Sequence, residues 1–500
     1  MVPFSLFVFI FFTTLFPSPL AVADLITCSG IVPMKYRNDK ISIADFGGIG
    51  DGRTLNTRAF RAAIYRIQHL RRRGGTLLYI PPGVYLTETF NLTSHMTLYL
   101  AKGAVIKAVQ GIEINENERM NVGPEWKLQE VDSSNWPVIA PLPSYGRGRE
   151  RPGGRYVSFI HGHGVHDVVI TGMNHQILLN MRPWVTCAVF GKVMDIDNLS
   201  KIVILGENGT IDGQGDAWWN MWRTGTLKYT RPNLVEFINS YNIIISNVMF
   251  LNSPFWNIHP VYCSNVVVRY VTILAPRDSP NTDGVDPDSS NNVCIEDSYI
   301  STGDDLVAVK SGWDEYGIAY GRSSYDITIR RISGSSPFAG VAVGSETSGG
   351  VANVLAEHLN FYDMGVGINI KTNIGRGGFI KNITVSNVYM ENSRKGLKIA
   401  GDTGDHPDDK FDPNALPIVK DITIKNAWGV KVQQAGSIYG LRDSPFTGIC
   451  LSNINFRGTT RPRSVPWTCS YVSGAALMVS PWPCSELTST EQDGLCSDNF

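Results

Sequence analysis

The chain has 500 residues, and its 44 lysines and arginines against 45 aspartates and glutamates leave a formal net charge of −1. This balance argues against a nucleic-acid-binding protein, which normally carries a basic surplus, so we expect no nucleic acid among its partners. Hydrophobic residues make up 43% and charged residues 18%, a composition that excludes a broadly disordered chain.

An export signal is predicted at the N-terminus. Residues 4–16 form an apolar run that is too short to span a bilayer comfortably. Ala21-Val22-Ala23 then provides the small-x-small pattern of a signal-peptidase site, although no Lys or Arg precedes the run. We expect residues 1–23 to be a signal peptide and the mature protein to be secreted, with no membrane association after cleavage; an uncleaved anchor is the alternative.

One amphipathic helix is predicted over residues 57–73. Phe60, Ile64, Ile67 and Leu70 recur on one face of this segment, and Gly74-Gly75 ends it. We expect the helix to belong to an N-terminal cap, roughly residues 40–110, which covers strand edges that would otherwise be unpaired.

The body of the chain repeats one short pattern, a turn residue followed by β-branched residues. The repeats begin at Asn242, Asn265, Asn292, Asp326, Asn353, Asn382, Asp421 and Gly448. Their steps of 23 to 39 residues leave no room for a helix between most strands, which argues against βαβ units. Because one repeat cannot bury its apolar face alone, neighbouring repeats must stack. The sequence therefore predicts an all-β fold, a right-handed parallel β-helix, as a single domain over residues 24–458.

The cysteines and sequons fit an exported protein. All eight cysteines follow residue 23, and an even count in an exported chain favours disulfides, whereas the absence of a CxxC pair argues against zinc. They are Cys28, Cys187, Cys263, Cys294, Cys450, Cys469, Cys484 and Cys496. The last four should staple residues 459–500, a Cys- and Pro-rich segment that has lost the repeat; the pairing stays open. Glycosylation sequons stand at Asn91, Asn198, Asn208 and Asn382.

Three aspartates are spaced by about one coil. Asp283 precedes the Asp304-Asp305 pair by 21 and 22 residues, so the three should meet on adjacent rungs. Stacked carboxylates repel one another, and one of them should hold a proton near neutral pH. A neutral acid beside ionised carboxylates is what glycoside hydrolysis requires, and in inverting enzymes the two groups are about 6.5–9.5 Å apart. We interpret the nearby Asp286 and Asp288 as turn formers.

A calcium site is the other interpretation of this acidic stretch. The glycine and glutamate offsets of an EF-hand are absent, so only a cluster of another kind stays open. We expect no metal and no cofactor.

Several motifs in order resemble the polygalacturonase family of glycoside hydrolases, in its plant branch. The matching segments are Asn281-Thr-Asp-Gly, Gly303-Asp-Asp, Val309-Lys-Ser-Gly, Val343-Gly-Ser and Ile370-Lys-Thr, with Asn208-Gly-Thr-Ile-Asp-Gly-Gln-Gly and Trp136-Pro-Val-Ile-Ala-Pro-Leu-Pro-Ser-Tyr-Gly-Arg-Gly-Arg-Glu. The resemblance covers roughly residues 40–460.

The resemblance implies a right-handed parallel β-helix and an inverting attack on α-1,4-linked galacturonan. Asp304 would be the general acid, Asp283 and Asp305 would hold and deprotonate the water, and Lys371 would pair with a galacturonate carboxylate. It implies no metal or cofactor, a pectic polysaccharide as the partner, the plant cell wall as the location, and a monomer.

The chain departs from the family at two positions of its recognition shell. Ala339 stands where the family has a histidine, and Asn369 stands where it has an arginine. Arginine offers a planar fork for a carboxylate, whereas asparagine offers only neutral hydrogen bonds. We count Asn281, Asn369 and His259, with Lys371, as candidate substrate contacts; for His259, 24 residues before Asp283, a packed structural role is equally open.

Three functions stay in play. The first is a hydrolase of pectin, acting on plain or decorated polymer in endo or exo mode. The second is a non-hydrolytic or altered-specificity pectin-binding homologue, which the changes at Ala339 and Asn369 favour. The third is a lyase on the same scaffold, which would need a calcium cluster and an arginine base.

Overall fold

The computed structural model describes residues 28, 37–70, 72–110, 136–172, 208–458, 465–487 and 496. The predicted signal peptide over residues 1–23, Cys187 and the sequon at Asn198 lie outside these residues. None of the helices in the described part is long and apolar enough to cross a membrane.

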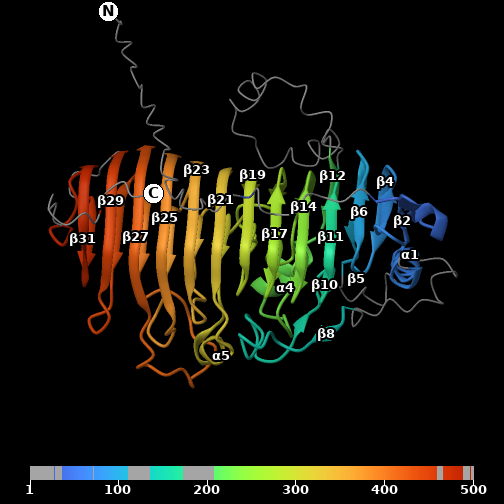
Figure 1. The fold of residues 1–500 in the computed structure, drawn as a ribbon, viewed down its shortest axis with the longest axis horizontal. Helices are drawn as coiled ribbons and strands as arrows, with labels where there is room; N and C mark the ends of the chain where they lie inside the picture. The colour runs from blue at the N-terminus through green and yellow to red at the C-terminus, as the bar shows by residue number, and fades with distance from the viewer. Residues whose placement is uncertain are drawn as a thin grey trace, which may run out of the picture.

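Parallel strands stack into one long solenoid, shown in Figure 1, which confirms the predicted parallel β-helix. Two of its three rows of strands form one continuous sheet, because long strands such as β19 pair with both β17 and β18 of the preceding coil. The strands of this sheet are β1 (Asp39–Ser42), β2 (Asp51–Leu55), β3 (Thr76–Ile80), β4 (Gly83–Thr87), β6 (Met96–Leu100), β7 (Ala104–Ala108), β11 (His166–Thr171), β12 (Gly209–Asp212), β14 (Tyr241–Ser246), β15 (Val248–Leu251), β17 (Ser264–Arg269), β18 (Thr272–Leu274), β19 (Asn291–Ser301), β21 (Ser324–Ser335), β23 (Val351–Tyr362), β25 (Phe379–Glu391), β27 (Ile418–Val430), β29 (Phe446–Arg457) and β31 (Val472–Ser480).

The third row, which we call the floor row, carries the candidate site. Its strands are β5 (Phe90–Asn91), β10 (Ile160–His163), β13 (Val235–Ile238), β16 (Ile258–Val261), β20 (Val307–Val309), β22 (Ala339–Val343), β24 (Val366–Lys371), β26 (Lys395–Ala400), β28 (Gln434–Tyr439) and β30 (Trp467–Ser470). Between β16 and β20, Val285 bridges to Ile258 and to Val307, so the row continues through the aspartate-rich segment.

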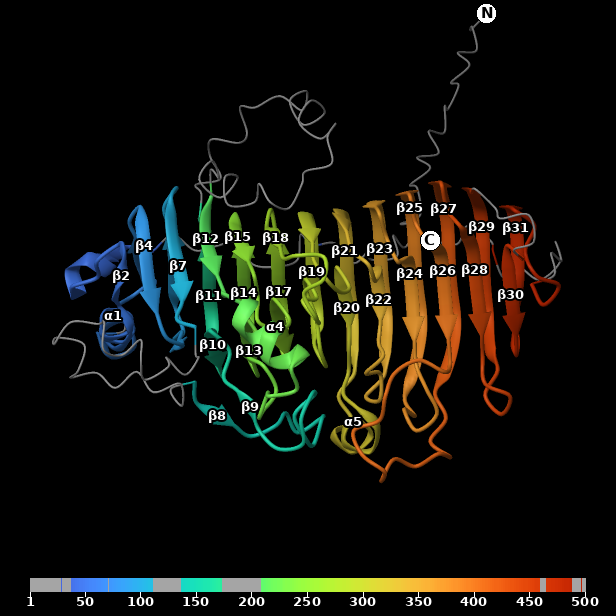
Figure 2. The ribbon, with the colours of Figure 1, turned by 180° about the vertical axis from the view of Figure 1, so that it is seen from behind.

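Short elements line one long edge of the solenoid. They are the helices α4 (Asp216–Arg223) and α5 (Asp314–Tyr320) and the antiparallel strands β8 (Val138–Ile139) and β9 (Arg155–Tyr156). Figure 2 shows α5, β8 and β9 at this edge together with the loop that follows β26.

The predicted turn residues carry the repeat. All eight have positive φ, between 52° and 66°. Asn and Asp tolerate this left-handed backbone better than other non-glycine residues. Their side chains also stack from coil to coil: Asn265 donates to Asn242 at 2.9 Å, and Asn292 donates to Asn265 at 2.7 Å.

The N-terminal cap contains α1 (Thr57–Leu70), which ends three residues before the predicted end, and a short 3-10 helix, η2 (Ile43–Phe46). Phe60, Ile64 and Ile67 are buried as the pattern predicts, but Leu70 is 51% exposed. The ring of Phe60 stacks on Phe90 of the floor row with centroids 4.6 Å apart, so the helix covers the first coils of the solenoid.

The C-terminal segment differs from the expectation. Strands β30 and β31 pair with β28 and β29, so the solenoid continues past residue 458. The sequence pattern missed this coil because β31 (Val-Ser-Gly-Ala-Ala-Leu-Met-Val-Ser) has few β-branched residues. The disulfides Cys469–Cys484 and Cys450–Cys496 staple this region, as expected, and a third joins Cys28 to Cys294. Cys263, by contrast, is a buried free thiol, so not every cysteine is paired.

Candidate active site

The outward positions of the floor row form two parallel columns. A methyl group built on Gly340 would contact Phe361 in the core, and Val341 also faces the core. The outward positions on either side of these two residues, 339 and 342, are therefore three residues apart. The first column contains Asn233, Trp256, Asp283, Asp305, Ala339, Val366 and Lys395, and the second contains Glu236, His259, Asp286, Ala308, Ala342, Asn369 and Lys398.

The three predicted aspartates meet on these columns. Each offers one carboxylate oxygen, and these oxygens all lie within 4.8 Å of one another. Asp283 and Asp305 are 3% and 1% exposed, whereas Asp304 is half-buried. The nearest oxygens are thus closer together than the 6.5–9.5 Å of a typical inverting pair.

Each aspartate is held by named donors. The Lys371 Nζ donates to Asp305 Oδ2 at 2.5 Å, and the Ala339 N–H donates to Asp305 Oδ1 at 2.8 Å. Asp304 accepts the Asn281 amide at 3.3 Å, while Arg231 donates to the other end of that amide at 3.0 Å. Asn281 therefore orients Asp304, with Arg231 behind it.

Burial and mutual repulsion raise the pKa of Asp283 and Asp304. Burial, with the charges of Asp283 and Asp305, raises the pKa of Asp304 well above its ordinary value. Burial also raises the pKa of Asp283 to about 6, although the charge of Lys310 opposes the shift. The raised pKa of Asp304 favours the protonated form of its carboxyl group, which is the form that can donate a proton.

Besides the half-buried Lys371, the buried Lys310 supplies a counter-charge. The Lys310 Nζ lies 3.7 Å from Asp283 and 3.2 Å from Glu346, and the Arg149 Nε donates to Glu346 at 2.7 Å. Although burial opposes it, the charges of Lys310 and Arg149 hold the pKa of Glu346 well below its ordinary range. The sequence analysis did not single out Glu346 or Arg149. Arg149 lies within the quoted segment that begins at Trp136, and Glu346 directly follows the Val343-Gly-Ser motif. These positions were the signal that could have identified both residues.

The three aspartates are also close enough to one another to bind a cation. The position is already neutralised in part, since Lys371 contacts Asp305 and Lys310 lies near Asp283. Calcium takes six to eight oxygen ligands, and two ammonium groups at this range compete with it.

Two interpretations of the sequence are wrong. Asp286 and Asp288, interpreted as turn formers, are fully buried in the floor row: Asp286 faces outward beside Asp283, and Asp288 accepts the Tyr145 hydroxyl at 2.6 Å. Among the residues that the structure describes, neither oxygen of Asp286 has a hydrogen-bond partner, and burial and the charge of Asp283 raise its pKa well above the ordinary value. The three-residue spacing from Asp283, which repeats along the floor row, was the missed signal.

His259 is the other correction, because it is not placed to touch substrate. It is 1% exposed and packs against the Trp256 ring, with Nδ1 2.9 Å from Glu236 and Nε2 3.4 Å from Asp288. Burial alone would lower its pKa, but the carboxylates of Asp288 and Glu236 raise it overall. The one-coil spacing correctly placed His259 on the second column. It gave no sign that another segment of the chain covers this part of the column.

The two departures from the family pattern lie beside the aspartates. Ala339 is fully buried and packs with Ala308 and Ala342. Asn369 faces outward between Ala342 and Lys398, and its Oδ1 lacks a hydrogen-bond partner within the described structure. At these two positions the side chains beside the aspartates are thus small and uncharged, as the sequence indicates.

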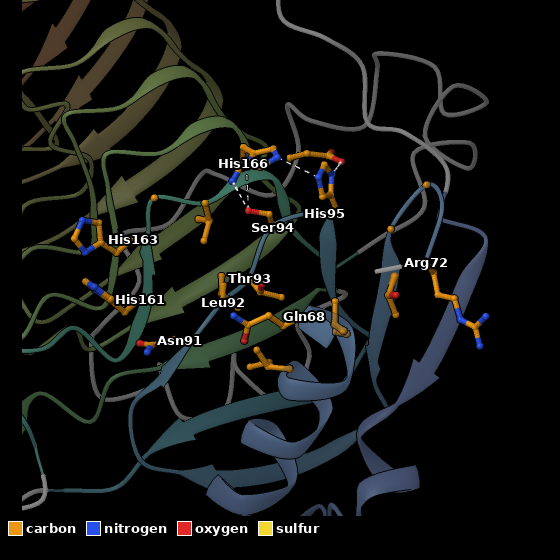
Figure 3. A pocket seen from close by; sticks show the side chains of 18 of the residues that line it. Gln68, Arg72, Asn91, Leu92, Thr93, Ser94, His95, His161, His163 and His166 are labelled. Atoms are coloured by element: carbon orange, nitrogen blue, oxygen red, sulfur yellow. Dashed lines mark hydrogen bonds and ion pairs between the residues drawn. The ribbon is translucent and has the colours of Figure 1, made fainter. Parts of the chain in front are cut away.

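A second hollow lies elsewhere, at the N-terminal end. It measures about 920 Å³, and Figure 3 shows His95, His161, His163 and His166 around it. His166 and His95 approach to 3.1 Å, and Asp167 bonds to His95 at 2.9 Å. These histidines therefore do not replace the one missing at position 339.

Comparison with known proteins identifies the family. Residues 185–480 match the family described as glycosyl hydrolases family 28. The chain is 43% identical to a protein of Vitis vinifera named "Probable polygalacturonase" over 464 residues, 92% of this chain and 83% of that one. Among solved structures, it resembles an exopolygalacturonase from Thermotoga maritima (TM-score 0.68, 24% identity, 90% of this chain and 94% of that one). It also resembles a polygalacturonase from Erwinia carotovora (TM-score 0.60, 21% identity, 89% and 98%). The fold is shared with both structures, and by its sequence match the chain belongs to glycosyl hydrolases family 28, the family of the plant polygalacturonases.

Proposed function

We propose that this protein is a secreted hydrolase that cleaves α-1,4-galacturonosyl linkages in pectin. The observation that carries the proposal is the partly exposed Asp304 with its raised pKa, set against the buried Asp283 and Asp305. Its relatives are named polygalacturonases, and the ammonium group of Lys371 is available to a polyanionic substrate at the rim of the site.

Each residue has a role in the proposed reaction. Asp304 protonates the leaving glycosidic oxygen, and Asp283 and Asp305 hold a water molecule and take its proton as the water adds to the sugar carbon. Lys371 has three donors and uses one on Asp305, so two remain for a galacturonate carboxylate.

We further propose that hydrolysis proceeds with inversion. Three carboxylates, rather than a pair, allow two of them to position the water while the third carries the proton. The close oxygens favour the opposite outcome, because retaining enzymes keep their carboxyl groups about 5–5.5 Å apart. Proton NMR of the first product anomer decides: the α-anomer at early times would indicate retention and would overturn the proposed inversion.

The neutral recognition shell favours a decorated pectin over plain homogalacturonan. Loss of a charged contact in a buried site costs a few kcal/mol, roughly a hundredfold in rate. The lack of charged contacts at Ala339 and Asn369 also favours the second candidate, a pectin-binding homologue that does not hydrolyse. The three aspartates, which lie close together, count against this candidate.

Export and glycosylation are proposed on the basis of the disulfides, which persist in oxidising compartments. Asn91 and Asn382 are exposed and Asn208 is half-buried, so the first two sequons are more accessible than the third. Mass spectrometry of the protein recovered from plant cell wall would detect the new N-terminus and the glycans; an intact N-terminus would overturn the proposed cleavage. A mass in solution equal to that of one chain would match the expected monomer, and a multiple of it would contradict that expectation.

The central test compares the wild-type protein with Asp304→Asn across homogalacturonan, xylogalacturonan and rhamnose-containing pectins. We expect reducing ends to appear with the wild type and to fall by about 10²–10⁴-fold in the variant, which keeps the side-chain shape but cannot donate the proton. Equal, negligible release by two folded proteins on every polymer would overturn the hydrolase and favour the binding homologue. Unsaturated products that depend on calcium would indicate a lyase.

A further inference from the structure

The floor row is covered on one side of the aspartates and open on the other. On the N-terminal side, Glu236, His259 and Asp286 are at most 1% exposed. On the C-terminal side, beyond the buried alanines, Asn369 and Lys398 of the same column are half-buried. A polymer therefore reaches the floor from one direction.

The cover is the segment over residues 142–150, which lies within one of the motifs quoted above. It is fixed at both sides of the floor row. On one side, Glu150 pairs with Arg231 at 2.5 Å. On the other side, the Tyr145 hydroxyl donates to Asp288 at 2.6 Å, and the carbonyl of Ser144 accepts the Trp313 N–H at 2.8 Å.

The middle of the cover is held to the far wall by an arginine. Arg149 donates to Glu346 at 2.7 Å, pairs with Asp405 at 3.0 Å, and lies 4.3 Å above the Trp313 ring. Leu142 and Tyr145 of the cover and Trp256 of the floor row belong to one buried apolar cluster. Charged pairs and packed rings together make the cover part of the folded core rather than a mobile loop.

The space left under the cover is too small for sugar. The cavity between the cover and the floor, lined by Arg155, Trp256 and His259 among others, measures about 30 Å³. That volume holds about one water molecule. A chain bound across Asp304 therefore cannot continue toward Trp256.

The open side carries two lysines that lack a carboxylate partner. Lys395 donates to Ser437 at 2.7 Å and Lys398 donates to Thr403 at 3.1 Å, and in the described structure neither ammonium group forms an ion pair. The two lysines occupy neighbouring outward positions of β26, and burial and the charge of Lys398 lower the pKa of Lys395. They sit three rungs beyond Asp305 and Ala308, or about 14 Å at the usual inter-strand spacing.

We propose that the site is one-armed, by which we mean that it binds the polymer on only one side of the aspartates. It accepts the end of a polyuronate chain, binds the remaining chain along β24, β26 and β28 with carboxylates near Lys395 and Lys398, and releases the terminal uronate. Hydrolysis at this bond transfers the elements of water, the hydroxyl to the sugar carbon and the proton to the leaving oxygen. The inference rests on the proposed hydrolase function.

The first experiment follows viscosity and products of polygalacturonan during digestion by the wild-type protein. We expect monouronate to be the product from the earliest time, with viscosity falling only in proportion to mass released. A ladder of oligomers with rapid loss of viscosity would overturn the one-armed site and leave the hydrolase intact. No release from any pectin would overturn the hydrolase, and the inference with it.

The second experiment tests the open arm with Lys395→Gln and Lys398→Gln on uronate oligomers of increasing length. Loss of a charged contact should raise KM by about tenfold for long oligomers, with kcat unchanged. The dimer, which does not reach three rungs away, should keep its KM. Lys420→Gln is the matched control, because Lys420 is exposed on another row and pairs only with the neighbouring Asp421. An equal effect on dimer and long oligomer, or none on either, would overturn the assignment of this arm.

Discussion

The aspartate site and the histidine hollow lie on the same row of strands, yet they differ in how their ionisable groups are held. In the hollow, His163 is exposed, and His95 and His166 contact each other beside Asp167 at the surface. At the aspartate site, Asp283, Asp305 and Lys310 are buried, and their charges act on one another with little solvent between them. Burial, rather than the volume of open space, creates the chemically useful pKa shifts.

The largest contrast is expected from matched substitutions in the two places. Asp305→Asn should reduce pectin hydrolysis by about 10³-fold or more, because the variant loses a carboxylate that holds the water and contacts Lys371. His163→Gln should leave the rate unchanged, because this side chain lies in the hollow. Initial rates of reducing-end release measure both. A comparable loss in the two variants would place the hollow in the reaction and break the contrast.

A smaller effect is expected at the rim of the aspartate site. Lys371→Met keeps the length of the side chain but removes the charge that contacts Asp305 and meets the substrate. We expect kcat/KM to fall by about 10- to 100-fold, as for the loss of a charged hydrogen bond. Lys420→Met, far from the site, is the control. An unchanged kcat/KM would show that the positive charge serves folding alone, which thermal unfolding of the same variant would then report.

The pH dependence separates stability from activity at Asp283. Its pKa rises from 3.8 to about 6 on folding, so the folded state binds this proton more tightly, and the resulting stabilisation, full at low pH, is lost as the pH rises through about 6. Asp283→Asn should therefore raise the Tm by a few degrees at pH 7 and leave it unchanged at pH 4. The wild-type kcat/KM should fall below about pH 6, as the carboxylate that takes the proton from water is neutralised. An equal Tm at pH 7 in both proteins would contradict the raised pKa.

The smallest effect is expected from a chelator. The carboxylates already have Lys371 and Lys310 as counter-ions, so EDTA should leave the initial rate and the Tm unchanged. A loss of rate that calcium restores would assign the cluster to a cation instead.

The sequence predicted what the repeat controls. The eight predicted turn residues mark the coils of the central body, and because the coil length is known from them, the meeting of Asp283 with Asp304 and Asp305 follows from counting. The repeat pattern does not predict which other segments of the chain cover each coil. The pattern placed His259 on the correct column but carries no information on the segment around Tyr145, which comes from over 100 residues earlier and buries it. Asp286 was misjudged for the same reason, since a buried and an exposed aspartate have the same letter.

The stacked asparagines have a further consequence, for how such proteins can change. Val285 and its partner Val307 are 22 positions apart, whereas Leu397 and its partner Gly436 are 39 apart, yet both pairs stack in the same row. Added residues are absorbed by loops at the edge, while the turn ladder keeps each rung in register. A lineage can therefore lengthen, shorten or exchange the segments that frame the substrate without displacing the carboxylates, so that substrate choice and chemistry are inherited as separable traits.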